Sequence, residues 1–247
     1  MTVESRRTPR SVPGLIGEAF RLYARFPLLF LVLAAGVVVP YRLIVLATTG
    51  AGPYTQASLG FGTSMLLLFV EWVLVDPLVS ALHVHAVAEV EEGRTPRLWP
   101  VVRRGLAVLP LVAAAAIMSG LAFAGGLILL VVPGAYFFLR LAVVAQAAAI
   151  ERETWLDALR RSWALTEGNV LHVLGFVVCT AAIGFAVGLP VKSLLPDVTS
   201  AGSFAVGVAV QVVLLSFTAL ATALLYFDLR ARRALLAATQ KRAETLS

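Results

Sequence analysis

Four charged residues of this sequence lie inside long apolar runs, where an ionisable side chain is a functional candidate by default. They are Arg42, Glu71, Asp76 and Arg140. A charge at the centre of a bilayer costs about 2.5–3.5 kcal/mol on insertion scales, so we expect these residues to pair. Two arginines and two carboxylates can close a neutral network. Such a network would either lock helix packing or line a path for protons or a substrate, and Arg42 could instead snorkel to the outer surface.

The spacing of the two carboxylates bears on whether they act together. Glu71 and Asp76 are five residues apart, which is about 140° around a regular α-helix. They are therefore not predicted to form an acid–base pair, unless Pro77 bends the helix and changes that angle.

The histidines invite a metal interpretation that their spacing does not favour. His83 and His85 are two residues apart, so on a helix they point in nearly opposite directions. His85 and Glu89 have i,i+4 spacing, but two ligands make a weak metal site. We therefore predict no metal and no cofactor, and expect the histidines to face lipid headgroups. His85, Glu89 and Glu92 are the only candidates for an intramembrane lipid enzyme, since no nucleophile elbow, Walker loop or dinucleotide fingerprint occurs.

The elements that must carry these residues are membrane spans. Hydrophobic residues make up 60% of the chain and charged residues 14%, and the mean hydropathy is +0.90. In hydrocarbon, only helices and closed barrels satisfy their own backbone, and about 20 apolar residues suffice for a helix to cross. The sequence predicts an all-α polytopic membrane protein: a segment 1–26, a six-span domain 27–227 and a charged tail 228–247. The spans are 27–49 (interrupted by Pro40), 59–90, 106–123, a fourth ending near 150, 170–191 and 203–227.

The turn between the third and fourth spans has two candidate positions. Gly125-Gly126 and Pro133-Gly134 both break the apolar run, and the second is favoured.

Two amphipathic segments, 14–26 and 151–169, are predicted to lie in the membrane interface. In the second, Trp155 and Trp163 share a face with Leu159, while Arg160 and Arg161 lie opposite. Such a helix places tryptophan at headgroup depth and arginine near anionic lipid phosphates. With Trp99, these four Trp and Arg residues are the expected interfacial anchors, and anionic lipids are the expected partners.

The same segments suggest an internal repeat. Arg-bearing stretches at 19–26, 101–106 and 158–163 each precede a two-helix hairpin. Their unequal separations leave two alternatives open, a pseudo-threefold architecture or a chance similarity.

Basic residues predict the orientation. Seventeen lie before span one, after span six or in the connections after spans two and four, whereas Lys192 alone lies in the other connections. The positive-inside rule therefore places both termini in the cytoplasm and the chain in the inner membrane. Because the arginines gather at span ends and not along one face, the net charge of +6 does not indicate nucleic-acid binding.

Five stretches stand out together: EAFRLYARF at 18–26, EEGRTP at 91–96, VVPGAYFFLRLAV at 131–143, ERETWLDALRRSWALTEGN at 151–169 and FTALATALLYFDLRAR at 217–232. In this order they resemble the bacterial family named for the membrane domain of glycerophosphoryl diester phosphodiesterase. The resemblance covers nearly the whole chain and implies six membrane helices without established chemistry. The phosphodiesterases use a separate metal-dependent barrel with an early His-Arg pair, and we expect neither here.

Three classes of function follow from these patterns. The leading one is a non-enzymatic membrane scaffold or subunit that interacts with lipids or envelope partners. The second is a small transporter built on Arg42, Glu71, Asp76 and Arg140, which a cavity reaching these charges would favour. The third is an intramembrane lipid-modifying enzyme.

Overall fold

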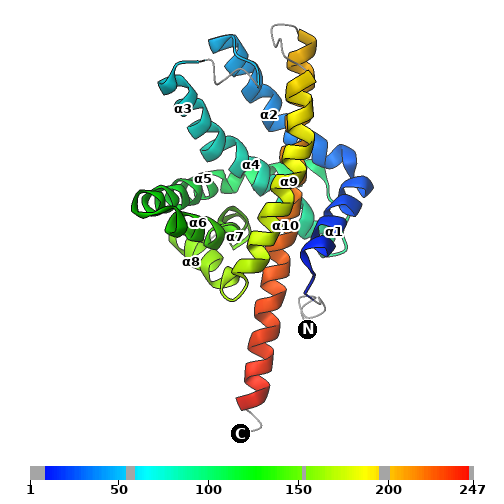
Figure 1. The fold of residues 1–247 in the computed structure, drawn as a ribbon. Coiled ribbons are helices and arrows are strands. Elements are labelled where there is room, and N and C mark those ends of the chain that lie inside the picture. Colours follow the sequence, from blue (N-terminus) through cyan, green and yellow to red (C-terminus); the bar gives the residue numbers. More distant parts are fainter. Residues whose placement is uncertain (1–8, 54–58, 152–153, 195–200, 245–247) are drawn as a thin grey trace.

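Every regular element of the computed structural model is a helix within the ranges that it describes, residues 9–53, 59–151, 154–194 and 201–244 (Figure 1). The predicted all-α fold is confirmed. The elements are α1 (Val12–Arg25), α2 (Pro27–Thr49), α3 (Phe61–Val70), the π-helix η3 (Glu71–Val75), α4 (Asp76–Glu91), α5 (Leu98–Leu129), α6 (Val131–Arg140), α7 (Val144–Glu151), α8 (Trp155–Thr166), α9 (Val170–Leu194) and α10 (Ala201–Glu244).

Within the described ranges, six stretches of helix are long and apolar enough to cross a membrane, as predicted for a multi-pass membrane protein. They are Pro27–Thr49, Phe61–Glu91, Leu98–Ile128, Val131–Glu151, Val170–Val191 and Ala201–Gln240. They form three hairpins, which we number in chain order: hairpin 1 comprises α2 to α4, hairpin 2 comprises α5 to α7, and hairpin 3 comprises α9 and α10.

One predicted break within the spans was wrong. Pro40 does not interrupt the first span, because α2 continues through it; a proline removes one helical hydrogen bond, and the hydrogen bonds on both sides keep the helix continuous. The charged tail predicted at 228–247 is helical over most of its length, because α10 continues to Glu244. Figure 1 shows this last part of α10 extending away from the rest of the molecule.

The turn between α5 and α6 lies at neither of the two predicted positions. It is made by Leu130 alone, whose backbone is extended (φ −171°, ψ 157°). The glycines have another use: a Cβ on Gly126 would lie 2.8 Å from the Cα of Gly134. Gly126 and Gly134 therefore allow the two helices to approach closely, as small residues do at membrane helix interfaces.

We expect Gly126→Ala to destabilise hairpin 2 by about 1–3 kcal/mol, because the new methyl group meets the backbone of α6. The matched control is Gly125→Ala, since a Cβ on Gly125 has no neighbour within 4 Å. Unfolding of both variants by denaturing detergent measures the effect. Equal stability of the two variants would contradict the close approach.

The second limb of each hairpin builds the core. In α4, α7 and α10 the fully buried side chains are mostly alanine, valine and leucine, including Val84, Val87, Ala147, Ala149, Leu224 and Leu225. α4 packs on both of the others, and α10 also contacts α7. The alanines of α7 leave room for this three-helix contact.

Each amphipathic segment packs on the hairpin before its own. The start of α5 lies on α4 of hairpin 1, and α8 lies on α7 and α5 of hairpin 2. α1 has no hairpin before it in the sequence, and it packs on α10 and α9 of hairpin 3. We call these three contacts, made by the start of α5, by α8 and by α1, the joints between hairpins. Two joints connect hairpins that follow each other in the chain, and the third connects the N-terminal helix α1 to hairpin 3. The three hairpins therefore form a closed ring. This arrangement agrees with the pseudo-threefold alternative.

Candidate intramembrane polar site

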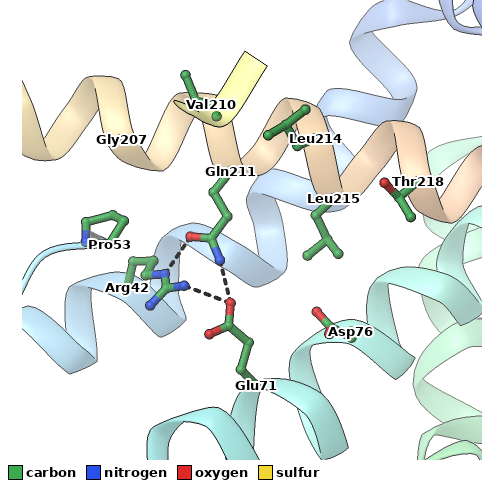
Figure 2. A pocket seen from close by; sticks show the side chains of 11 residues that line it. Arg42, Pro53, Glu71, Asp76, Gly207, Val210, Gln211, Leu214, Leu215 and Thr218 are labelled. Atoms are coloured by element: carbon green, nitrogen blue, oxygen red, sulfur yellow. Dashed lines mark hydrogen bonds and ion pairs between the residues drawn. The ribbon is translucent and has the colours of Figure 1, made fainter. Parts of the chain in front are cut away.

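Three side chains from three different helices meet at one hydrogen-bonded cluster within the apolar spans (Figure 2). Arg42 of α2 donates from Nη2 to Oε1 of Glu71 at 2.7 Å. The Arg42 Nε donates to Oε1 of Gln211 on α10, and the Gln211 amide donates in turn to Oε1 of Glu71, both at 2.5 Å. The cluster joins hairpins 1 and 3, as a set of interhelical polar contacts does in a membrane.

A π-helical turn places Asp76 on the same side of the helix as Glu71. In η3 the backbone N–H of Asp76 donates to the carbonyl of Glu71, five residues back. A π-helix has more residues per turn than an α-helix, so it sets residues five apart at a smaller angle than the about 140° of a regular α-helix. The separation expected for a regular helix therefore does not apply here, and the angle is changed beside Pro77, as the alternative allowed. Pro77 follows directly and has no N–H to donate, which favours a local change in the hydrogen-bond pattern at this point.

Arg42 is held tightly but is not fully satisfied. The residue is 4% exposed, and its guanidinium lies 5.1 Å from the ring centroid of Tyr41. The hydroxyl of Tyr41 donates to the carbonyl of Leu67 on α3, so the ring is fixed against this helix of hairpin 1. The Nη1 of Arg42 is buried without a hydrogen-bond partner in the described part of the chain. A buried unsatisfied donor on a charged group is costly, so this nitrogen requires an explanation.

A cavity of about 390 Å³ reaches the cluster. Hairpins 1 and 3 line it together, through Arg42, Pro53, Glu71, Asp76, Gly188, Gly207, Val210, Gln211, Leu214, Leu215 and Thr218. Figure 2 shows the carboxylate of Asp76 without the dashed contacts that join the other three polar groups. Among the residues that the structure describes, Asp76 has no side-chain hydrogen bond or ion pair.

Arg140 does not belong to this cluster, so the predicted four-residue network was wrong in one member. The guanidinium of Arg140 lies 4.4 Å from the centroid of Trp163 and 5.7 Å from that of Tyr136. Its carbonyl accepts hydrogen bonds from Ser162 and Thr166 of α8. α6 ends at Arg140, so the residue fastens this helix end to α8, far along the chain from Glu71.

We expect Arg140 and Trp163 to be coupled by about 1–2 kcal/mol in a double-mutant cycle with leucine at each position, because a cation on an aromatic face is worth this much when desolvated. The free energies of unfolding of the two single variants and the double variant give the coupling. A second cycle of Arg140→Leu with Glu71→Gln should be additive, and strong coupling there would restore the four-residue network.

The histidines do not face lipid headgroups as predicted. His83 is fully buried, and its Nδ1 lies 2.8 Å from the carbonyl of Val79. Its Nε2 lies 2.9 Å from the hydroxyl of Ser216 on α10, and its ring stacks on Phe30 of α2. His83 thus joins three helices of the core. In the described part of the chain no three metal-ligating side chains gather.

An acidic residue near the end of the apolar stretch of each second limb holds the next joint of the ring. Glu89 accepts from Nη1 of Arg104 at 2.9 Å and from the backbone N–H of Arg97 at 3.2 Å, both on the following segment. Glu151 accepts from Nε of Arg161 at 2.7 Å. Glu89 is thus committed to a structural contact, which weakens its candidacy as a catalytic group.

Asp228 of α10 holds the third joint. Its Oδ1 accepts from the backbone N–H of Arg10 at 2.7 Å, just before α1. Its Oδ2 accepts from Nε of Arg232 at 2.6 Å and lies 3.4 Å from Nε2 of His172. Sequence reasoning considered Glu89 only as a metal or catalytic candidate and did not single out Glu151 or Asp228. The shared position of these three residues near the end of the apolar stretch of each second limb was a readable signal.

The predicted interfacial anchors differ in their exposure. Trp99 at the start of α5 is 74% exposed, and the side chain of Arg160 is 71% exposed and pairs with Asp157. Trp155 is exposed, whereas Trp163 is partly covered by Arg140. Arg161 pairs with Glu151 and is not free for lipid as predicted. The buried face of α8 is made by Ala158, Ser162, Leu165 and Thr166, not by its tryptophans.

The chain matches no protein-family model, no curated protein and no solved structure. Its function is therefore argued from the geometry alone.

Proposed function

We propose that this protein is a non-enzymatic, multi-pass inner-membrane scaffold whose closed ring of hairpins holds anionic lipid headgroups on the cytoplasmic side. The observation that supports it most is the exposure of Arg and Trp on the three ring joints. More than 70% of the side-chain surface is exposed in Arg21 on α1 and in Arg160 on α8. The residue Trp99 on α5 is likewise more than 70% exposed. Arginine beside tryptophan at the end of apolar spans suits the headgroup region of an anionic leaflet.

The sequence segments that form these joints also carry the excess of arginine, which supports cytoplasmic termini. A cysteine placed at position 160 in a Cys179→Ser background tests the orientation. It should react with a membrane-impermeant maleimide in inverted vesicles and not in intact cells. Reaction in intact cells would overturn the proposed orientation.

Anionic lipid should stabilise the purified protein through these joints. We expect added phosphatidylglycerol or cardiolipin to raise the unfolding temperature more than phosphatidylcholine does, because each arginine near an anionic surface is worth about 1 kcal/mol. Arg21→Gln combined with Arg160→Gln should remove most of the difference. The matched control is Arg94→Gln, which lies in the connection before α5 and pairs with Glu92. Equal stabilisation by both kinds of lipid would contradict the proposal.

A second candidate, a small transporter, is favoured by the cavity that reaches Arg42 and Asp76. A dry, fully paired cluster would have supported only a structural lock. Here the Asp76 carboxylate at the cavity and the buried Nη1 of Arg42 beside it have no partner among the described residues. The structure offers less support for a lipid-modifying enzyme, because Glu89 is engaged by Arg104 and His85 is buried in the core.

A further inference from the structure

Two groups of opposite charge beside the cavity between hairpins 1 and 3 have no hydrogen-bond partner among the described residues. One is Nη1 of Arg42, which belongs to a residue 4% exposed and has no hydrogen-bond partner in the described chain. The other is the carboxylate of Asp76, which lines the same cavity. Two further polar groups of the lining, those of Glu71 and Gln211, are already engaged with the other two guanidinium nitrogens (Figure 2).

The charge balance limits what this site can hold. Glu71, Asp76 and Arg42 in their ionised forms give the cavity one excess negative charge, which disfavours a simple anion in an apolar environment. A simple cation would suit Asp76 but would leave the Arg42 nitrogen unsatisfied. A ligand that carries both an anionic oxygen and an ammonium group satisfies both free groups at once.

Apart from Thr218, the rest of the lining is apolar. Val210, Leu214 and Leu215 contribute branched side chains, and Gly188 and Gly207 contribute no side chain at all. α9, which carries Gly188, is the least buried of the spanning helices, so this wall of the cavity is the one nearest to lipid. An acyl chain has room to leave the cavity on this side.

We infer that this cavity binds a zwitterion that carries an anionic group and a primary ammonium, with the anionic group on Arg42 and the ammonium on Asp76. The chemistry fits the headgroup of an ethanolamine phospholipid and also a free zwitterion of the same kind. The inference deepens the transporter candidate by naming its ligand class, and it is independent of the lipid contacts at the ring joints. The cavity can bind a zwitterion at equilibrium even if the protein does not transport it.

Ligand affinity of the purified full-length protein tests the charge requirement. Four probes are compared by thermophoresis: dihexanoyl phosphatidylethanolamine, dihexanoyl phosphatidylglycerol, which lacks the ammonium, decylamine, which lacks the anionic group, and soluble O-phosphoethanolamine. The ethanolamine lipid should bind at least tenfold more tightly than the glycerol lipid or decylamine. Equal affinity for these three probes would overturn the inference. Binding of O-phosphoethanolamine within tenfold of the lipid would identify a free zwitterion as the ligand, and weaker binding would identify the lipid.

Two variants locate the site. Asp76→Asn removes the charge from a side chain that makes no hydrogen bond here, and should weaken ethanolamine-lipid binding at least tenfold. Gly188→Leu fills the cavity with all charges intact and should abolish binding; its Cβ would meet only Leu214 Cδ1, at 4.0 Å. The matched control is Gly184→Leu, whose Cβ has no neighbour within 4 Å and which lies outside the cavity. Unchanged affinity in both site variants would overturn the inference.

Proteoliposomes separate binding from transport. Accumulation of a labelled zwitterion by the native protein, lost in Asp76→Asn, would support both the site and the transporter candidate. Binding without accumulation would support the site and leave the scaffold proposal in place. Stabilisation by phosphatidylglycerol through Arg21 and Arg160 is unaffected by Asp76→Asn in either case, so the two proposals fail independently.

Discussion

Arg42→Leu is expected to destabilise the protein by about 3–5 kcal/mol, the effect of breaking a buried ion pair by removing one partner. The substitution leaves the carboxylate of Glu71 inside the apolar spans, where the amide of Gln211 is the only donor to it among the described residues. The cost arises from the uncompensated charge and not from lost packing, since leucine fills much of the same volume. Unfolding in mixed micelles by increasing amounts of denaturing detergent measures the change.

A second substitution distinguishes stability lost through the uncompensated charge from stability lost through packing. Arg42→Leu with Glu71→Leu removes both charges, so it should recover most of the stability lost by Arg42→Leu alone. Glu71→Gln combined with Arg42→Leu serves as the intermediate case, because the amide is neutral and still accepts from Gln211. A double leucine variant no more stable than Arg42→Leu would show that the guanidinium acts by packing on Tyr41.

Asp228→Ala is expected to open the joint between α1 and hairpin 3 and to cost about 3–5 kcal/mol. The side chain of Asp228 is 3% exposed, and its loss leaves Arg232 without its closest carboxylate and the N–H of Arg10 without its acceptor. A cysteine in place of Leu22, which is buried in the joint, should then react with thiol reagents faster than in the native protein. The thiol reaction rate distinguishes opening of this joint from general loss of stability.

The matched control for this charge is Glu167→Ala. Glu167 also pairs with an arginine of α10, Arg233 at 3.3 Å, but its side chain is 61% exposed. Exposed ion pairs contribute about 0–1 kcal/mol, so this variant should remain near native stability and should not increase labelling at position 22. Similar losses in both variants would show that burial does not set the strength of the Asp228 contacts.

The spans could be predicted from sequence because their signal is an average over many residues. About twenty apolar side chains define a helix that can cross a bilayer, so a few misplaced residues did not matter, and α2 has the predicted bounds Pro27–Thr49. The turn at Leu130 depends on one residue whose type carries no turn preference. The glycines nearby gave a stronger but misleading signal, because Gly126 and Gly134 serve helix contact and not chain reversal.

Part of the polar site could also be predicted, because its charged residues are easy to recognise in an apolar sequence. Arg42, Glu71 and Asp76 stand out because charge is rare in an apolar run, so their pairing could be expected from cost alone. Arg140 stood out for the same reason, but an aromatic ring can also hold a guanidinium, and sequence does not reveal which partner is nearby. Gln211 was one polar residue among several in its span, and the π-turn at Glu71 depends on local hydrogen bonding that helical periodicity does not encode.

The joint between α1 and α10 has a consequence for biosynthesis. The hydrogen bond from the backbone N–H of Arg10 to the Asp228 carboxylate joins residues 218 positions apart. The helix α1 therefore cannot dock until α10, which is synthesised much later, has been made. Until then the apolar side of α1, which includes Leu15 and Ala19, can be covered only by the bilayer surface. In a nascent chain arrested before hairpin 3, α1 would remain undocked. This undocked helix would distinguish unfinished copies from completed ones for quality-control proteases.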